Sequence, residues 1–261
     1  MFNSKKSLGQ HFLNSPQIIA DIVNAGKVTK EDLVLEIGPG EGVLTSELLA
    51  TGAEVISVEK DDRLIPVLQQ KFIAEIAKKQ LTLVHADILD LELPHIAQKP
   101  YKIVANIPYY ITGQIIRMFL ESDKEPQSMT LLIQKEVAER IIAKDGKESL
   151  LSLSVKAFGT PNLVRVVGRG AFSPQPNVDS AVLTIEDISK KRLEGVDEKF
   201  FFQILHAGFA HKRKQLLPNL SSLYKKENLL KVFEKLGIET KTRAEDLPLQ
   251  TWVTLCSTIK Q

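Results

Sequence analysis

Three polar segments of this sequence combine residue types that bind nucleosides, and each follows an apolar run typical of a buried strand. The first is residues 36–42, with the sequence Glu-Ile-Gly-Pro-Gly-Glu-Gly, and the others begin at Glu59 and Asp87. Glycines let a backbone pass close to a ligand, and an acid about 20 residues further on accepts hydrogen bonds from a ribose diol. Glu59 follows Gly38 at this spacing and fits that role, and Asp87 could receive an adenine amino group.

The charge of the glycine-rich segment distinguishes between two classes of cofactor. A dinucleotide-binding turn has the pattern G-x-G-x-x-G, whereas this one is G-x-G-x-G with Glu41 inside it. Glu36 and Glu41 would repel a pyrophosphate, but they suit S-adenosylmethionine, which has no phosphate and carries a positive sulfonium. We therefore favour S-adenosylmethionine. A nicotinamide dehydrogenase, or a turn whose glycines are only structural, stays as an alternative.

A fourth segment, Asn106-Ile107-Pro108-Tyr109, follows the next apolar run and suggests the methyl acceptor. The lone pair of a planar adenine N6 amine is delocalised into the ring. Hydrogen bonds from this amine to the Asn106 side chain and the Ile107 carbonyl would favour a pyramidal nitrogen and align it for attack. Tyr109 would stack on the face of the flipped-out base. The alternative is a tight turn that uses Pro108 for its geometry.

These segments need a scaffold that brings the ends of several strands together, and the pattern of elements predicts one. Apolar strand-like runs alternate with helical patterns up to residue 143, which indicates a parallel α/β sheet with helices on both faces. Ligands bind at the carboxyl ends of the strands in such a sheet. Residues 163–167 and 180–185 are predicted as an antiparallel pair that closes the sheet, and 63–79 as one helix. The proline-rich residues 172–176 are predicted to be irregular.

The distribution of charge divides the chain in two. Residues 1–189 carry 20 Lys and Arg against 24 Asp and Glu, whereas residues 190–261 carry 14 against 8. We expect a Rossmann-like domain over residues 1–187, a charged linker, and a small helical domain over residues 198–261. A basic end suggests an anionic partner, although a solvated lysine-rich surface would give the same counts.

Composition excludes other classes of protein. With 43% hydrophobic and 25% charged residues, the chain is typical of a folded globular protein. No apolar run approaches the ~18 residues of a membrane span, and no secretory signal is expected. The single cysteine, Cys256, favours a reducing, cytoplasmic location. The five histidines are scattered without partners at ligand spacing, so no metal is expected. We expect a monomer.

Many ordered motifs together resemble the ribosomal RNA adenine dimethyltransferase family over nearly the whole chain. They lie at residues 6–13, 36–40, 106–111, 134–140, 172–182, 212–216, 219–220, 236–238 and 243–245. One departure is Leu150-Leu151, where relatives usually have Tyr-Gly, which puts family details for that helix start in doubt.

The resemblance implies a class I methyltransferase that uses S-adenosylmethionine to dimethylate N6 of two adjacent adenosines near the 3′ end of small-subunit (16S) rRNA. The partner would be the small ribosomal subunit. One alternative is the relative that dimethylates a large-subunit adenosine and confers macrolide resistance, which the C-terminal motifs disfavour. A second is a non-catalytic RNA-binding assembly factor, which the intact segment 106–109 disfavours.

The resemblance also implies roles for individual residues. The N-terminal motif would close over the cofactor, so that His11 and Leu13 touch it. Gly38 would approach its methionine part, and Asn106 would lie where cofactor and target nitrogen meet. Phe172 would form the second wall of the base pocket opposite Tyr109, although without the family we would place it in the core. The residues expected to bind rRNA are Lys212, Arg213, Lys214, Lys225 and Lys226.

Overall fold

The computed structural model describes residues 11–91, 99–193, 195–211 and 213–260. The N-terminal motif before His11 and the predicted RNA-binding residue Lys212 therefore lie outside the described residues. The chain forms two compact units, one of residues 1–138 and 160–188 and the other of residues 139–159 and 189–261. Residues 139–159 thus group with the second unit, whereas the division made from the sequence placed them in the first.

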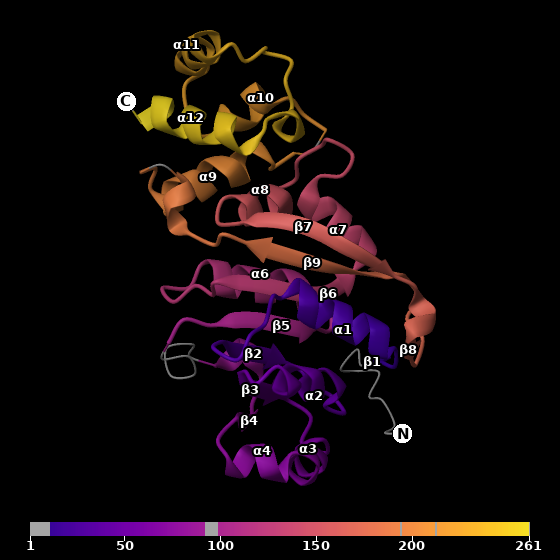
Figure 1. The fold of residues 1–261 in the computed structure, drawn as a ribbon. Coiled ribbons are helices and arrows are strands. Elements are labelled where there is room, and N and C mark those ends of the chain that lie inside the picture. The colour runs from indigo at the N-terminus through magenta and orange to yellow at the C-terminus, as the bar shows by residue number, and fades with distance from the viewer. Residues whose placement is uncertain (1–10, 92–98, 194, 212, 261) are drawn as a thin grey trace. The chain divides into compact units, whose positions relative to one another are not determined.

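A mixed sheet forms the centre of the first unit. Its strand order, over the described residues, is β4 (Leu81–His85), β3 (Glu54–Glu59), β2 (Leu33–Ile37), β5 (Lys102–Asn106), β6 (Ser128–Gln134), β9 (Ser180–Glu186) and β7 (Thr160–Val167). The first five strands are parallel, and β9 is antiparallel to both β6 and β7. Figure 1 shows these strands, with α1 in front of the sheet. The predicted α/β class and the predicted antiparallel pair are confirmed.

Most helices of the first unit lie between successive parallel strands along the chain, whereas α1 precedes β2. The helices are α1 (Pro16–Ala25), α2 (Val43–Ala50), α3 (Ile65–Lys71), α4 (Ile73–Ala77) and α6 (Thr112–Leu120), with α7 (Lys135–Ile142) beginning in this unit. The prediction of one helix over 63–79 is wrong, because α3 ends and α4 begins at Phe72. Phe72 is 4% exposed, and its ring packs against Gly42 of the glycine-rich loop. Burying the ring there accompanies a backbone that departs from helical geometry at this residue.

Two very short strands anchor the N-terminal segment. β1 (Phe12–Leu13) pairs antiparallel with β8 (Phe172–Ser173). The prediction that residues 172–176 are irregular is therefore wrong for the first two, because their backbone pairs with a segment close to the start of the chain. Pairing between two strands so far apart in the sequence cannot be predicted from the local composition of either one. Leu13 and Phe172 both join the hydrophobic core of the first unit.

The second unit is helical, as the sequence predicted for residues 200–261. Its helices among the described residues are α8 (Leu150–Lys156), α9 (Glu198–Gly208), α10 (Leu216–Leu220), α11 (Lys226–Leu236) and α12 (Leu249–Lys260). Trp252 is fully buried, and a Cβ at Gly208 would lie 2.4 Å from its ring, so α9 and α12 need a glycine at this contact. None of the described helices is long and apolar enough to cross a membrane.

Candidate active site

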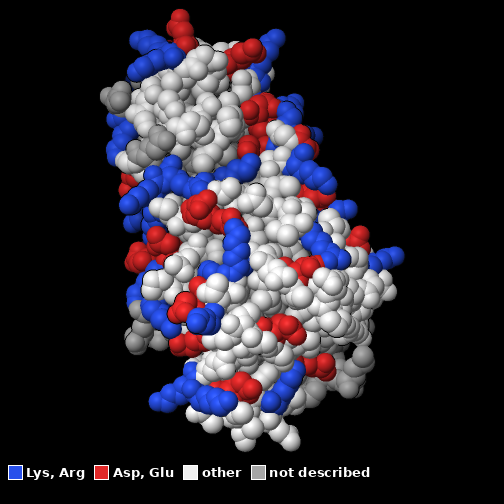
Figure 2. Space-filling model, in the orientation of Figure 1, with Lys and Arg blue, Asp and Glu red and all other residues white. Residues whose placement is uncertain are grey.

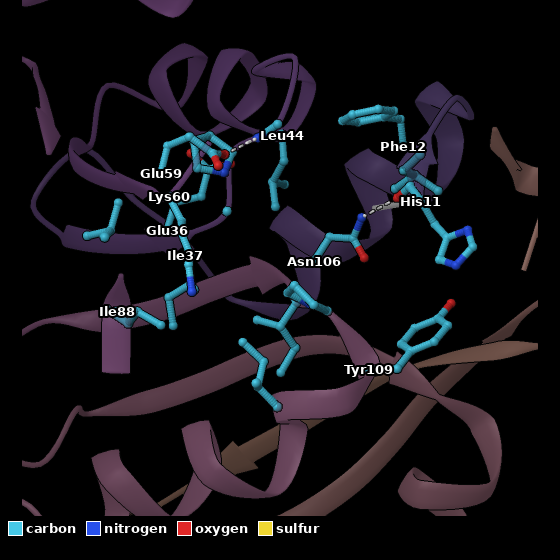
Figure 3. A pocket seen from close by; sticks show the side chains of 18 of the residues that line it. His11, Phe12, Glu36, Ile37, Leu44, Glu59, Lys60, Ile88, Asn106 and Tyr109 are labelled. Atoms are coloured by element: carbon cyan, nitrogen blue, oxygen red, sulfur yellow. Dashed lines mark hydrogen bonds between the residues drawn. The ribbon is translucent and has the colours of Figure 1, made fainter. Parts of the chain in front are cut away.

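A cavity of about 280 Å³ opens at the carboxyl ends of the parallel strands in the first unit. Its walls come from the loops after β2, β3, β4 and β5, together with the N-terminal segment from His11 to Leu13. Figure 3 shows Glu36, Glu59 and Lys60 together on one side of the cavity, and His11, Asn106 and Tyr109 on the other. The volume is near the lower end of the range for small-molecule sites.

The glycine-rich loop after β2 has backbone angles that glycine alone adopts readily. Gly38, Gly40 and Gly42 have φ values of +67°, +59° and +74°. The Gly38 amide donates to the Val58 carbonyl at 2.9 Å, which ties the loop to β3. Lys71 stabilises the loop, because its ammonium donates hydrogen bonds to the carbonyls of Glu41 and Gly42 at 2.9 and 3.0 Å. Sequence reasoning did not single out this lysine.

Glu36 is a buried carboxylate that lines the cavity and is 1% exposed. Its Oε2 accepts hydrogen bonds from Thr45 Oγ1 at 2.7 Å and Ser57 Oγ at 2.6 Å. Its Oε1 is buried and accepts no hydrogen bond from any described residue. Burial raises the pKa of Glu36 to about 7, even though both hydroxyls and Lys71 oppose the shift. A cationic ligand would supply the missing partner for Oε1.

Glu59 lies at the end of β3 and is 5% exposed. Its Oε2 accepts from the Gly40 amide at 3.2 Å and its Oε1 from the Asp61 amide at 2.7 Å. A carboxylate offers about four lone-pair sites, so Glu59 keeps capacity for a ligand hydroxyl. Burial raises the pKa of Glu59, against the lowering effect of these backbone hydrogen bonds.

Asp87 follows β4 and also lines the cavity. Lys60 Nζ lies 2.5 Å from its Oδ2, and the Leu89 amide donates to its Oδ1 at 3.1 Å. The hydrogen bond from Lys60 lowers the pKa of Asp87, so the carboxylate stays ionised and can accept from an amino group. This ion pair could not be foreseen, because nothing in the local sequence joins two residues on separate strand ends.

Asn106 ends β5 at the other side of the cavity. Its side-chain nitrogen donates to the His11 carbonyl at 3.3 Å, and Figure 3 shows its amide oxygen on the side of Tyr109. The His11 imidazole stacks on the Tyr109 ring, with 5.7 Å between centroids and 22° between planes. His11 Nδ1 is 2.8 Å from the Pro174 carbonyl. Burial raises the pKa of the Tyr109 phenol, which therefore stays neutral.

The cavity brings together all but one of the predicted catalytic and cofactor-binding residues. The lining contains His11, Leu13, Gly38, Glu59, Asp87, Asn106, Ile107, Pro108 and Tyr109. Phe172 is absent from this lining; it is 4% exposed and packs in the core, and the ring stacked on Tyr109 is that of His11. The role of Phe172 as a second wall stays a prediction.

The chemistry of the lining fits a cofactor that contains a nucleoside and carries positive charge. Glu36, Glu41, Glu59 and Asp87 supply four acidic side chains, while Ile37 and Ile88 supply apolar surface. The described residues contain no group of three or more His, Cys, Asp or Glu side chains placed to hold a metal ion.

The predicted RNA-binding residues lie in the second unit. Of the four that are described, Arg213 and Lys214 follow α9, and Lys225 and Lys226 stand at the start of α11. All four are exposed. Figure 2 shows groups of Lys and Arg on the visible face interspersed with Asp and Glu.

Comparison with known proteins gives consistent matches. The profile of the family described as "Ribosomal RNA adenine dimethylase" matches residues 1–261. A Ribosomal RNA small subunit methyltransferase A of Dehalococcoides mccartyi is 44% identical over 97% of this chain and 87% of its own. The protein of the same description from Clostridium botulinum is 38% identical over 95% of this chain and 91% of its own.

Two solved structures have the same fold as this chain and are more than 25% identical to it in sequence. A dimethyladenosine transferase from Plasmodium falciparum has a TM-score of 0.81 and 28% identity, covering 94% of this chain and 96% of its own. The 23S rRNA methyltransferase ErmE has a TM-score of 0.79 and 27% identity, covering 96% of this chain and all of its own.

Proposed function

This chain belongs to the ribosomal RNA adenine dimethylase family, and from that premise we propose how its residues carry out the reaction and on which RNA. The chain is an S-adenosylmethionine-dependent rRNA adenine dimethyltransferase. The substrate we propose is a pair of adjacent adenosines near the 3′ end of small-subunit 16S rRNA. The curated relatives at 38–44% identity carry the small-subunit description, which supports this substrate over a large-subunit adenosine.

The cofactor would lie along the ends of β2, β3 and β4. When bound, it supplies a methyl group on a positively charged sulfur. Gly38 lets the backbone approach the methionine part, Glu59 accepts from the ribose hydroxyls, and Asp87 accepts from the adenine amine. His11 and Leu13 cover the cofactor from the N-terminal side. All five residues line one cavity, which supports these assignments.

The observation that carries the acceptor assignment is the orientation of the Asn106 amide. Its nitrogen is committed to the His11 carbonyl, which leaves the oxygen to accept an N–H of the target N6. The Ile107 carbonyl accepts the second N–H, with Pro108 holding the turn. These hydrogen bonds weaken conjugation with the ring and position the nitrogen lone pair for attack. The methylated nitrogen is acidic and loses its proton to solvent, so no strong base is needed.

Tyr109 would hold the target base by stacking. Its ring already carries a planar heterocycle, the His11 imidazole, and centroids 5.7 Å apart leave no room for another ring between them. Adenine would therefore take the place of the imidazole when the His11 side chain rotates away, while the His11 carbonyl keeps its hydrogen bond with Asn106. Base–aromatic stacking contributes roughly 1–3 kcal/mol per contact.

The second unit would bind rRNA through Arg213, Lys214, Lys225 and Lys226, with Lys212 beside them in the sequence. Their exposure supports contact with phosphates, which dominates the affinity for RNA backbones. A small-subunit rRNA substrate is consistent with action in the cytoplasm. The monomeric state stays a prediction.

The test is methyl transfer to ribosomal subunits that lack the modification, with labelled cofactor and identification of the product nucleoside. Wild-type protein should yield N6,N6-dimethyladenosine on small subunits and none on large subunits. Asn106→Ala should abolish transfer and leave cofactor affinity within about tenfold, ~1.4 kcal/mol. Asn162→Ala, which alters an exposed asparagine on β7, is the matched control. Wild-type turnover by Asn106→Ala would refute the assignment.

A further inference from the structure

Hydrogen bonds restrain Tyr109 both at its backbone and at its phenol oxygen. At the backbone end, Tyr109 follows Pro108 and begins a 3-10 turn, and Thr112 Oγ1 donates to its carbonyl at 3.0 Å. At the other end, the phenol oxygen is 2.6 Å from Ser180 Oγ. With the backbone fixed, the ring cannot rotate about its side-chain torsions without breaking the hydrogen bond to Ser180.

Ser180 is itself fixed by the sheet. It is fully buried, begins β9, and lies in register between Gln134 of β6 and Val167 of β7. The preceding residue, Asp179, accepts from the Lys135 amide through its carbonyl and from the Arg169 amide through its side chain, both at 3.0 Å. The backbone that carries the Ser180 hydroxyl is therefore held in place at the carboxyl end of β6.

Tyr109 and Asn106 reach the reaction centre from the same loop, but their fixed points differ. Asn106 ends β5 and pairs with Leu132 of β6, whereas the phenol end of Tyr109 is fixed by β9. The hydrogen bond between Tyr109 and Ser180 therefore sets the angle of the stacking face relative to the Asn106 amide. That angle decides whether a stacked base presents its amine to Asn106.

We propose that Ser180 is a positioning residue for methyl transfer: its hydroxyl fixes the plane of the Tyr109 ring so that a stacked adenine presents N6 to Asn106. This inference rests on the proposed stacking role of Tyr109. Misplacement of a reacting group by a fraction of its van der Waals radius slows the chemical step. Loss of the hydroxyl should thus lower kcat more than it raises the KM for RNA, and it should leave cofactor binding unchanged.

The test is a double-mutant cycle with Ser180→Ala and Tyr109→Phe, which each remove one side of the hydrogen bond and keep the stacking ring. Single-turnover transfer to small subunits should fall roughly three- to tenfold for either variant. The double variant should be no slower than the slower single variant, because the two changes remove the same interaction. Ser180→Thr keeps a hydroxyl and should retain the wild-type rate within about twofold.

Controls separate positioning from stability. Thr184→Val removes another buried hydroxyl from β9, away from Tyr109, and should leave the rate unchanged even if thermal stability falls. Cofactor affinity measured by calorimetry should be the same for all variants. Tyr109→Phe leaves Ser180 unchanged, so this variant tests the hydrogen bond even if Ser180→Ala does not fold.

Two results would overturn the inference: a wild-type rate for Tyr109→Phe, or rate losses that multiply in the double variant. Failure of the proposed function has a different signature. If Tyr109→Ala transfers methyl groups at the wild-type rate, Tyr109 does not stack the base, and the role of Ser180 falls with it. If Tyr109→Ala is strongly impaired and Tyr109→Phe is not, only the inference about Ser180 is refuted.

Discussion

Two glycines of the glycine-rich loop after β2 should respond differently to the same substitution by alanine. Gly38 and Gly42 both have left-handed backbone angles, so alanine at either costs about 1 kcal/mol of conformational strain. A Cβ at Gly38 meets nothing within 4 Å, and Gly38 lines the cavity. A Cβ at Gly42 would lie 2.6 Å from the Phe72 ring and 2.8 Å from Leu68. Phe72 and Leu68 are 4% and 1% exposed, so neither can move aside freely.

The expected magnitudes follow from these distances. Overpacking adds about 1–3 kcal/mol, so Gly42→Ala should lower the free energy of unfolding by about 2–4 kcal/mol. Gly38→Ala should lower it by about 1 kcal/mol, but weaken cofactor binding by more than tenfold, above ~1.4 kcal/mol. Replacing Phe72 by Leu should reduce the cost of Gly42→Ala, because the two sites share one contact.

The assay combines urea unfolding with calorimetric titration of the cofactor. Unfolding of the first unit should be followed by hydrogen exchange of α2 amides, because the only tryptophan of the sequence, Trp252, lies in the second unit and reports on that unit. Equal losses of stability for Gly38→Ala and Gly42→Ala would refute the packing argument. Unchanged cofactor affinity in Gly38→Ala would remove that glycine from the binding site.

Two further predictions concern charge. Because burial raises the pKa of Glu36 from 4.5 in the unfolded chain to about 7, folding retains its proton between these values. Its contribution to stability is therefore complete below pH 4.5 and falls by about 3 kcal/mol as pH rises through 7. Glu36→Gln should remove this component from a pH series of urea midpoints, and an unaltered difference from wild type across pH 5–8 would contradict it. Replacing Arg213, Lys214, Lys225 and Lys226 by Ala should weaken binding to small subunits. It should also reduce the slope of log affinity against log salt concentration by about one for each phosphate that is no longer neutralised. An unchanged slope would mean that these residues are solvated and do not contact RNA.

The sequence was sufficient to predict the parallel strands and the polar residues that follow them, because both are local properties of the sequence. A buried parallel strand is a continuous apolar run, and glycine, acid or asparagine after it is visible in the same stretch of residues. The positions of Glu59, Asp87 and Asn106 at one edge of the sheet followed from this pattern and from the topology of parallel strands. The fold class was confirmed for the same reason.

What the sequence could not supply are contacts between side chains far apart along the chain. The hydroxyl of Ser57 reaches Glu36 across 21 positions, and that of Ser180 reaches Tyr109 across 71. A serine within an apolar strand gives no sign of whether its hydroxyl has such a partner. The break at Phe72 had a similar origin, because packing under the glycine-rich loop, which comes much earlier in the sequence, overrode the helical pattern.

The pairing of β1 with β8 has a consequence for the order in which this protein is made. The residues that line the cavity lie between His11 and Gln114, so a ribosome synthesises all of them before it reaches Phe172. The strand that fixes the N-terminal segment, Phe172–Ser173, emerges well after them. β9, which covers the outer edge of β6, follows it. A nascent chain thus contains every residue that lines the cavity while β1 still lacks its partner strand, and only synthesis of the later residues allows that segment to pair.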